Sequence, residues 1–352
     1  MGEVYPTLPS MLRKFDRYAR RDAFQGETPE ELKAWQESTK ALLWDLLGLD
    51  KMETAPLRPV LTERVSLPGG ICRERWTIDT EPEVTMPFYV LLPPKAHRTT
   101  RPFLCPPGHG GGGKFTVAGL REYGAVGEKI DFYNYDYGLQ LCHMGYVALC
   151  PDIRGFGERR EELASAQSLP AALTGDCYRL ARMGEPLGIP AAGMLVWDLM
   201  RLIDYVAWRG EWDTHALSCL GFSGGGMQTL YLAALDQRVG LAVISGYLYG
   251  FRDALLTLNT NCSCNYVPHL WEHLDMGDIA SLIAPRPLLV QSCREDRLNG
   301  PRGVVNAVEQ VEILRRAYAL LDAPEKLIHQ LCPGPHRWHG EHLEKHLKAL
   351  IR

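Results

Sequence analysis

The sequence lacks a long apolar run, a large excess of charge and an internal repeat. No apolar run reaches the roughly 18 residues of a membrane-spanning helix, so we expect no membrane segment. The 38 Lys and Arg against 42 Asp and Glu leave a net charge of −4, and the missing basic excess argues against a nucleic-acid partner. Hydrophobic residues make up 46% of the 352 residues. That share excludes a disordered chain and allows one large domain or two smaller ones.

A secretory signal and a disulfide scaffold are also missing. The amino-terminal residues contain no apolar signal segment. The 10 cysteines look abundant, but in a chain of 352 residues they do not make a disulfide-dense scaffold. Several of them, including Cys105, Cys150 and Cys219, lie in apolar, strand-like segments. We therefore expect buried, reduced thiols and a cytoplasmic protein.

Residues 1–57 are expected to form an N-terminal helical extension, followed by a catalytic domain over 58–352. Thr28-Pro29-Glu30-Glu31 contains a helix-capping Thr, a first-turn Pro and the Glu of a capping box. Leucines at helical spacing follow as far as Gly48. From 58 to 92 the apolar residues alternate as in strands with one solvated face.

After residue 100, short apolar strands alternate with helices. The expected strands are 102–106, 146–151, 216–221, 241–246, 286–292 and 326–331. The expected helices are 134–144, 193–209, 224–235, 302–321 and 340–351. This alternation of strands and helices predicts an α/β fold, with a mostly parallel sheet covered by helices on both faces. Among these elements, the segment 155–192 shows no clear periodicity of apolar residues. Such a long irregular connection is typical of a lid or binding loop.

The strongest motif is Gly221-Phe222-Ser223-Gly224-Gly225. It follows a strand-like run and precedes a helix-like run, which is the context of a nucleophile elbow. The turn can close only around small neighbours, and Gly stands two positions before and two positions after the serine. The N–H of Gly224 would then point toward a developing oxyanion at a helix N-terminus.

A second glycine cluster, 108–113, is ambiguous. Gly108, Gly110 and Gly113 satisfy a dinucleotide fingerprint, and 108–114 matches most of a phosphate loop. However, Phe115 stands where a phosphate loop needs Ser or Thr, and no acidic residue closes a second strand at the required distance. We favour the interpretation that this segment supplies the second half of an oxyanion hole.

An elbow serine needs a base and an acid, in the chain order serine, acid, histidine. Asp296 and Glu295 both follow the strand 286–292, and register favours Asp296. His336 and His339 both follow the last strand, and His336, just after Gly-Pro, is the better base.

A possible metal site lies further along the loop region. Cys262 and Cys264 with His269 and His273 supply ligands of the kinds that zinc prefers. The C-x-C spacing is tighter than usual, so we favour loop cysteines near a pocket and expect no metal.

The elbow, the 107–113 segment, Asp152-Ile153-Arg154-Gly155-Phe156-Gly157, the 294–297 loop and the 335–340 segment together resemble the α/β-hydrolase superfamily. More narrowly, residues 85–352 resemble its acetylxylan-esterase-like, dienelactone-hydrolase-related branch. The resemblance implies an α/β-hydrolase fold with an eight-stranded sheet, a serine triad and no cofactor. Position by position it assigns the nucleophile, acid and base to Ser223, Asp296 and His336. It assigns the oxyanion hole to the N–H groups of Gly224 and of His109 or Gly110.

The sequence therefore predicts a serine carboxylic-ester hydrolase. Family resemblance favours the removal of acetyl or other small acyl groups from carbohydrate or aryl esters. Aromatic residues on loops near the triad could line its substrate pocket: Tyr247, Tyr249, Tyr266, Trp271 and Trp338. A peptidase or amidase with the same triad and a catalytically silent binding module remain alternatives, and the sequence leaves open whether the chain forms a homo-oligomer.

Overall fold

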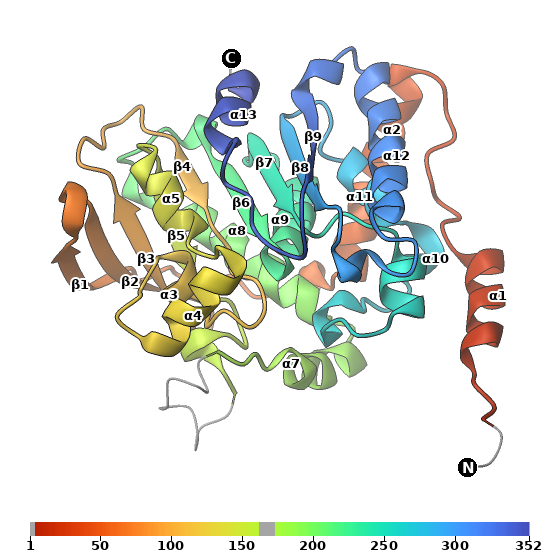
Figure 1. Cartoon of the computed structure of the whole chain (residues 1–352), viewed down its shortest axis with the longest axis horizontal. Helices are drawn as coiled ribbons and strands as arrows, with labels where there is room; N and C mark the ends of the chain where they lie inside the picture. The colour runs from red at the N-terminus through yellow and green to blue at the C-terminus, as the bar shows by residue number, and fades with distance from the viewer. Residues whose placement is uncertain (1–3, 162–172, 352) are drawn as a thin grey trace.

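The computed structural model describes residues 4–161 and 173–351 and places a twisted sheet between two layers of helices (Figure 1). Its strands are β1 (Val60–Ser66), β2 (Cys72–Glu81), β3 (Val84–Leu92), β4 (Pro102–Leu104), β5 (Val147–Pro151), β6 (Ser218–Phe222), β7 (Leu241–Ser245), β8 (Leu288–Cys293) and β9 (Leu327–Cys332). Its helices are α1 (Leu8–Tyr18), α2 (Pro29–Leu46), α3 (Lys114–Val117), α4 (Gly124–Tyr133), α5 (Tyr137–His143), α7 (Cys177–Gly184), α8 (Ala191–Arg209), α9 (Gly224–Leu235), α10 (Leu270–His273), α11 (Met276–Ser281), α12 (Val304–Leu320) and α13 (Leu343–Leu350).

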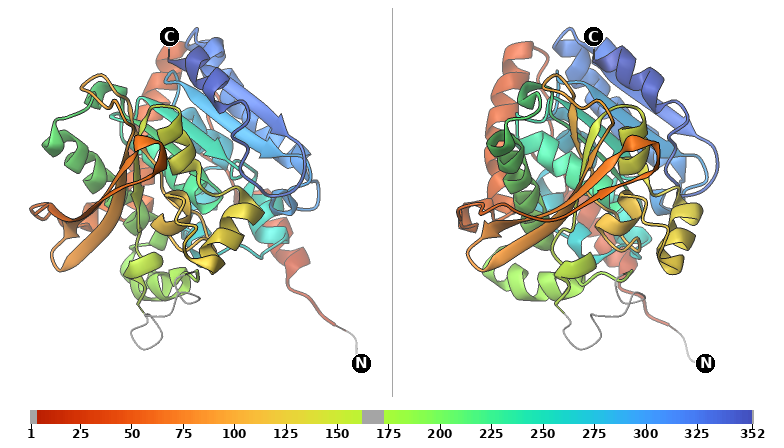
Figure 2. Two further views of the ribbon diagram at one scale, coloured as in Figure 1. Left: turned by 60° about the vertical axis from the view of Figure 1, so that its left-hand side comes forward. Right: turned by 90° about the vertical axis from the view of Figure 1, so that its left-hand side faces the viewer.

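The strands follow the order β1-β2-β3-β5-β4-β6-β7-β8-β9. β1, β2, β3 and β5 pair antiparallel, and all pairings from β5 through β9 are parallel. The mostly parallel α/β sheet is confirmed, but it has nine strands among the described residues instead of the expected eight. The number eight came from the family resemblance, whereas the strands expected over 58–92 are confirmed as β1, β2 and β3. β1 is a mostly exposed edge strand rich in polar residues, and such strands tolerate solvent on one side. Figure 2 shows this antiparallel end twisting away from the parallel part.

The parallel strands are apolar because helices cover both faces of the sheet. One buried cluster joins the sheet to α2, α8, α9, α11 and α12, and the other joins it to α3, α5 and α13. β5, β6, β7 and β8 are buried along their whole length. The six apolar strands expected after residue 100 are confirmed as β4 to β9.

Helix α2 begins at the predicted capping box. The Thr28 hydroxyl accepts from the N–H of Glu31, and the Glu31 carboxylate accepts from the N–H of Thr28. Leu32 and Leu43 of this helix are fully buried in the cluster shared with the sheet. The side chain of Arg20, between α1 and α2, pairs with Asp278 at 2.6 Å. Helix α2 therefore packs on the sheet's own core, whereas α1 has no buried residue.

The irregular segment 155–192 falls partly outside the described residues, because 162–172 are not among them. In its described part, α7 buries Cys177, Leu180 and Ala181 in the protein. Among the described helices, none alone is long and apolar enough to cross a membrane. One sharply bent pair, 177–187 with 191–209, passes that test by length and composition only.

His329 on β9 makes the stability of this fold depend on pH. Burial, with a contribution from Arg315, lowers the pKa of His329 to about 4 from 6.5, while its Nε2 lies 3.1 Å from the hydroxyl of Ser292. The unfolded chain therefore binds a proton more readily than the folded one. The stabilisation of the fold that neutral His329 contributes is complete above pH 6.5 and is lost as the pH falls toward 4.

We expect His329→Gln to reduce the loss of the free energy of unfolding between neutral and acidic pH by up to about 3 kcal/mol. Urea unfolding at about pH 7.5 and about pH 4.5 measures the change in the free energy of unfolding. His215→Gln, at an exposed position, is the matched control. An unchanged difference between the two pH values in His329→Gln would contradict the assignment.

Candidate active site

Ser223 occupies the sharp turn between β6 and α9. Its backbone has φ 58° and ψ −123°, a conformation that costs a non-glycine residue about 1–3 kcal/mol. Its N–H donates to the carbonyl of Ser245 at 2.8 Å, and its own carbonyl accepts from Met227 at 3.1 Å. The turn is thus fixed to β7 on one side and to α9 on the other, which exposes the hydroxyl at the carboxyl end of the sheet.

Two glycines make this turn sterically possible. A Cβ on Gly221 would lie 2.1 Å from the carbonyl oxygen of Gly225, and a Cβ on Gly225 would lie 2.2 Å from that of Pro106. Neither contact is tolerable, because real Cβ atoms do not approach backbone so closely. The sequence motif therefore marks positions where strand, turn and helix backbones touch.

His336 and Asp296 form a hydrogen-bonded pair that lies beside this turn. Nδ1 of His336 is 2.6 Å from Oδ2 of Asp296. The other carboxylate oxygen of Asp296 accepts from the N–H of Leu298 at 2.8 Å, and the Asp296 side chain is almost fully buried. The ring of His336 packs on Phe222, the neighbour of the serine, with centroids 4.5 Å apart. Among the described residues, Nε2 of His336 has no hydrogen-bond partner.

Glu295 and His339, the alternative acid and base, have different neighbours. Glu295 is exposed and uses its backbone N–H to bond the carbonyl of Gly334. Nδ1 of His339 is 3.4 Å from Glu341, and its carbonyl accepts from Gln291. The structure thus brings Asp296 and His336 together and leaves Glu295 and His339 apart from them.

A cavity of about 340 Å³ joins the serine and the histidine. Its lining residues are His109, Tyr133, Tyr135, Phe222, Ser223, Thr260, Asn261, Cys262, Leu298 and His336. Three aromatic rings and two histidines therefore face the space next to the serine. The size and the mixed lining suit a small organic ligand.

The five aromatic residues expected in the substrate pocket are not among these lining residues. Tyr247, Tyr249 and Trp338 are buried in the core, where Trp338 donates to Gln140 at 3.0 Å. Trp271 packs between Phe15 and Phe251, and Tyr266 packs on it. That expectation is wrong, because a loop position does not reveal which way a ring points.

One of the three rings that line the cavity, Phe222, belongs to the elbow motif, and the other two, Tyr133 and Tyr135, come from a segment that no motif marked. Tyr133 ends α4, and Tyr135 follows it. Tyr135 fits into the glycine-rich segment: a Cβ on Gly108 would lie 2.3 Å from its hydroxyl, and a Cβ on Gly111 would lie 2.1 Å from its Cε1. Its hydroxyl donates to the carbonyl of His109 at 3.1 Å. The glycines of 108–113 thus allow the backbone to wrap around an aromatic ring beside Ser223.

The glycine-rich segment is also joined to the elbow helix. The side chain of Gln228 on α9 donates to the carbonyls of Pro107 and Gly224 at 2.9 and 3.0 Å. A Cβ on Gly224 would lie 2.5 Å from Nδ1 of His109. The ring of His109 and the backbone of Gly108 therefore lie directly against Gly224, which places the glycine-rich segment beside the elbow.

The lysine after this segment is not available for a phosphate. Lys114 is fully buried and its ammonium pairs with Asp152 and Glu158. The same Asp152 accepts from the N–H of Lys114 at 2.7 Å and from that of Glu158 at 3.0 Å. A phosphate loop uses its lysine on the nucleotide, so these contacts argue against that alternative.

The cysteines of the 262–264 segment have different neighbours from those expected. His269 is exposed and pairs with Glu272, and His273 pairs with Asp22. Cys262 and Cys264 instead lie beside Cys177 and His109. The alternative ligand set with C-x-C-x4-H-x3-H spacing does not come together, because the turn at His269 directs both histidines toward the surface and the amino-terminal helices. Cys262 lines the cavity, in keeping with the favoured interpretation of loop cysteines near a pocket.

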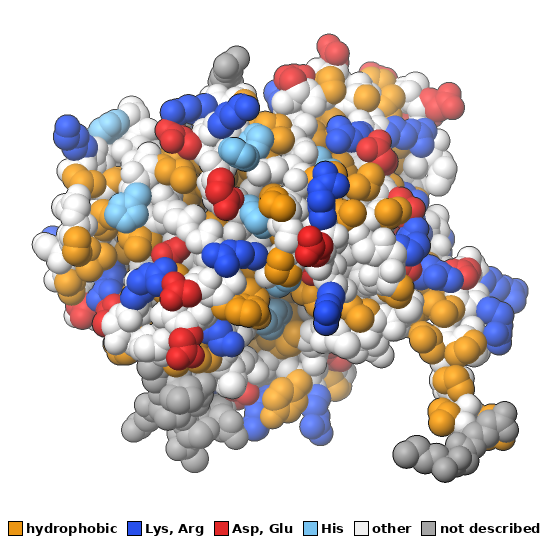
Figure 3. Space-filling view, in the orientation of Figure 1, with side chains coloured by type: hydrophobic (Ala, Val, Ile, Leu, Met, Phe, Trp, Pro, Cys, Tyr) orange, Lys and Arg blue, Asp and Glu red, His pale blue; other side chains and the backbone are white. Residues whose placement is uncertain are grey.

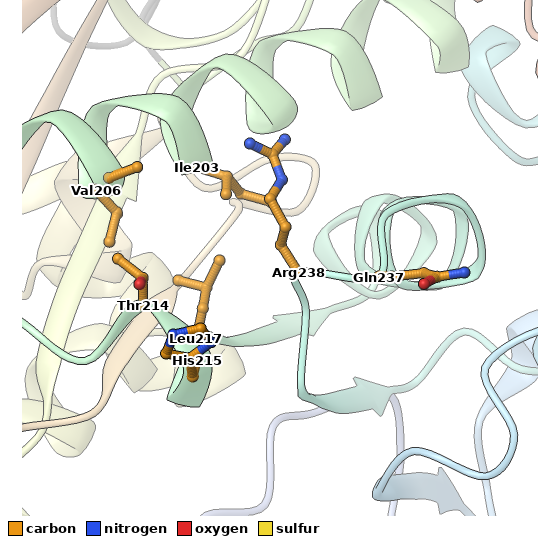
Figure 4. Close-up of a pocket in the computed structure, with 8 residues that line it drawn as sticks. Ile203, Val206, Thr214, His215, Leu217, Gln237 and Arg238 are labelled. Atoms are coloured by element: carbon orange, nitrogen blue, oxygen red, sulfur yellow. The ribbon is translucent and has the colours of Figure 1, made fainter.

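A larger hollow lies at the opposite edge of the sheet. About 440 Å³ in volume, it is bordered by residues of α8 and by those that precede β6 and β7, such as His215, Leu217 and Arg238 (Figure 4). Arg238 is held by Asp204 and Asp236. The amino ends of parallel strands rarely carry sites in such folds, and this hollow contains no paired acid and base.

On the face shown in Figure 3, basic and acidic side chains are interspersed, in keeping with the small net charge.

Comparison with known structures supports the description of the fold. A "putative acetyl xylan esterase" from Bacteroides fragilis superposes with a TM-score of 0.75 at 20% identity, covering 94% of this chain and 83% of its own. "Methylesterase BT1017" gives a TM-score of 0.68 at 19% identity, covering 98% and 67% of the respective chains. "Glucuronoyl Esterase from Solibacter usitatus" gives 0.66 at 16% identity, covering 95% and 96%.

Sequence comparison finds a relative and a family. A protein of Bacillus subtilis (strain 168) named "Putative hydrolase YtaP" is 30% identical over 167 residues, which are 47% of this chain and 52% of that protein. The match thus spans about half the length of the curated relative. The model of the Abhydrolase family matches residues 5–348, almost the whole chain, and this confirms the α/β-hydrolase resemblance seen in the motifs. The chain belongs to the Abhydrolase family.

Proposed function

We propose that this protein is a serine esterase with Ser223 as nucleophile, His336 as base and Asp296 as the acid that orients it. The observation that carries the proposal is the juxtaposition of a strained elbow serine and the His336–Asp296 pair at one cavity. The solved structures with the same fold, titled as acetyl xylan, methyl and glucuronoyl esterases, support ester hydrolysis as the reaction.

In the first half of the reaction, Nε2 of His336 takes the proton of the Ser223 hydroxyl as its oxygen attacks the ester carbonyl. The tetrahedral intermediate collapses, the alcohol leaves with the proton from His336, and an acyl-serine remains. In the second half, His336 deprotonates a water molecule that attacks the acyl carbon, and the acid leaves as the Ser223 oxygen takes that proton back from His336. Asp296 accepts from Nδ1–H, which keeps Nε2 free as a base and stabilises the imidazolium.

The oxyanion is stabilised by backbone N–H groups. Gly224 is the first residue of α9, so its N–H has no acceptor within the helix. The positive end of the helix dipole adds to its effect. The second donor comes from the glycine-rich segment, at His109 or Gly110. Each donor contributes about 3 kcal/mol to the transition state.

The substrate class follows from the cavity and from the related folds. A small acyl ester of a carbohydrate or an aryl alcohol fits a cavity of about 340 Å³ lined by Tyr133, Tyr135 and Phe222, because aromatic rings stack on sugar and aryl faces. No cofactor is needed for this chemistry, since the triad supplies nucleophile, base and acid.

Ser223→Ala should abolish the hydrolysis of p-nitrophenyl acetate. Loss of the nucleophile of a triad lowers kcat on the order of 10⁶-fold. Ser38→Ala, at an exposed serine of α2, is the matched control and should keep full activity. A fluorophosphonate should label the unmodified protein and the control, but not Ser223→Ala. Equal turnover by Ser223→Ala and the unmodified protein would refute the assignment.

Paired variants should distinguish the acid and the base from their rivals. Asp296→Asn should lower kcat by about 10⁴-fold, because the histidine loses its orientation and tautomer. His336→Gln should lower it at least as much. Glu295→Gln and His339→Gln should stay within about threefold of the unmodified protein, since neither contacts the reacting groups. A larger loss of kcat in Glu295→Gln than in Asp296→Asn would overturn the acid, and a larger loss in His339→Gln than in His336→Gln would overturn the base.

An ester panel tests the substrate class. We expect kcat/KM for p-nitrophenyl acetate to exceed that for the octanoate by at least about tenfold, because each methylene that a pocket cannot accommodate costs about 1–3 kcal/mol. Acetylated xylo-oligosaccharides and methyl esters of glucuronate should be compared under the same conditions. Hydrolysis of peptide or amide substrates at rates above those of all the esters would instead favour a peptidase or amidase.

A further inference from the structure

Three segments far apart in the sequence bring four potential metal ligands together at the wall of the cavity. They are His109 in the glycine-rich segment, Cys177 at the start of α7, and Cys262 and Cys264 in the loop before α10. Their ligand atoms all lie within 4.8 Å of one another. Among the residues that the structure describes, this is the one such group of three or more His, Cys, Asp and Glu.

The distances suit tetrahedral coordination. Nε2 of His109 lies 3.2 Å from Sγ of Cys264 and 3.6 Å from Sγ of Cys177. An imidazole nitrogen at about 2.0–2.1 Å and a thiolate at about 2.3 Å from a tetrahedral zinc ion are about 3.6 Å apart. The two nitrogen-to-sulfur distances are close to that value, and all four ligand atoms lie within 4.8 Å of one another.

The surroundings of the group resemble those of a structural metal site. Cys177 and Cys264 are buried, while His109 and Cys262 are partly exposed toward the cavity. Asn265 donates to the carbonyl of Cys262 at 3.0 Å, and the Tyr247 hydroxyl holds Asn265 at 2.8 Å. The loop that carries two of the four ligands is therefore fixed by further hydrogen bonds, as the supports of metal ligands usually are.

We propose that His109, Cys177, Cys262 and Cys264 bind one zinc ion. Three thiolates and one imidazole form a closed set of four protein ligands, which is typical of structural zinc and leaves no open position for catalysis. Binding requires deprotonated ligands, so Zn²⁺ displaces one proton from each of three thiols while the imidazole binds in its neutral form.

The consequence concerns the shape of the cavity. The ion ties together the oxyanion segment, the start of α7 and the 262–264 loop. It fixes the ring of His109, which lies directly against Gly224. The metal thus acts on the backbone around the oxyanion position from outside the triad.

Metal analysis of the full-length protein, purified under reducing conditions with zinc supplied, tests the site. We expect about one zinc per chain. Cys177→Ser, Cys264→Ser and His109→Gln should each lower the zinc content to below about 0.2 per chain, because a lost ligand removes much of the binding free energy. Cys72→Ser, a free cysteine on β2, and His273→Gln are the matched controls and should keep their zinc.

A second measurement needs no variant and therefore does not depend on the folding of one. Replacement of zinc by Co²⁺ in the unmodified protein should give the thiolate-to-cobalt charge-transfer band and the visible spectrum of tetrahedral coordination. Bound metal should also protect three thiols from a thiol reagent until the protein is unfolded.

Several results would overturn the proposal: less than about 0.2 zinc per chain in the unmodified protein, a cobalt spectrum without thiolate bands, or unchanged zinc in the ligand variants. A disulfide among Cys177, Cys262 and Cys264 under these conditions, seen as a loss of two hydrogens in the non-reduced protein, would do the same. None of these readouts requires esterase activity. Failure of the metal site is therefore distinguishable from failure of the proposed reaction.

Discussion

The backbone of Ser223 has a positive φ, and the rest of the site depends on keeping it there. The strain persists because the surroundings leave no alternative: β6 is paired on both sides and fully buried, and α9 packs on the same sheet. The close contacts of Gly221 and Gly225 hold strand, turn and helix in backbone-to-backbone contact. A side chain at either glycine would separate these elements and relax the turn. The free energy of packing the sheet thus maintains a local conformation that the serine alone would not adopt.

A second constraint acts on the glycine-rich segment. Buried Asp152 accepts hydrogen bonds from the backbone at Lys114 and Glu158 and pairs with the Lys114 ammonium. Leaving any one of these groups unpaired in the interior would cost several kcal/mol. The network therefore fixes the end of the glycine-rich segment, while Tyr135 and Gln228 fix its middle and its start. A zinc ion on His109 would add a fourth attachment to the same backbone.

Much of the fold could be predicted from the sequence because its strands are buried on both faces. β5 to β8 appear as continuous apolar runs, and the Thr28 capping box marks the start of α2. The strand-like alternation over 58–92 covers β1, so the sheet's ninth strand departs from the strand number that the family resemblance implied and not from the residue pattern. The prediction of the aromatic residues that line the pocket was wrong for a different reason. Tyr247 and Tyr133 are both tyrosines close to loops, and only packing decides that one is buried and the other faces the cavity.

The sequence by itself determined the local chemistry: a small-residue turn around Ser223, a flexible glycine segment, and the order serine, acid, histidine. The first two features depend on residues close together in the chain, whose conformational limits are set by sterics and hydrogen bonding over a few positions. The order of the triad follows from the sequence through the family resemblance. Only the tertiary structure decided that His336 meets Asp296, and that Cys262 and Cys264 meet His109 and Cys177 in place of His269 and His273. Such contacts join residues tens or hundreds of positions apart. They arise from how the helices and loops pack on the sheet, which no local spacing encodes.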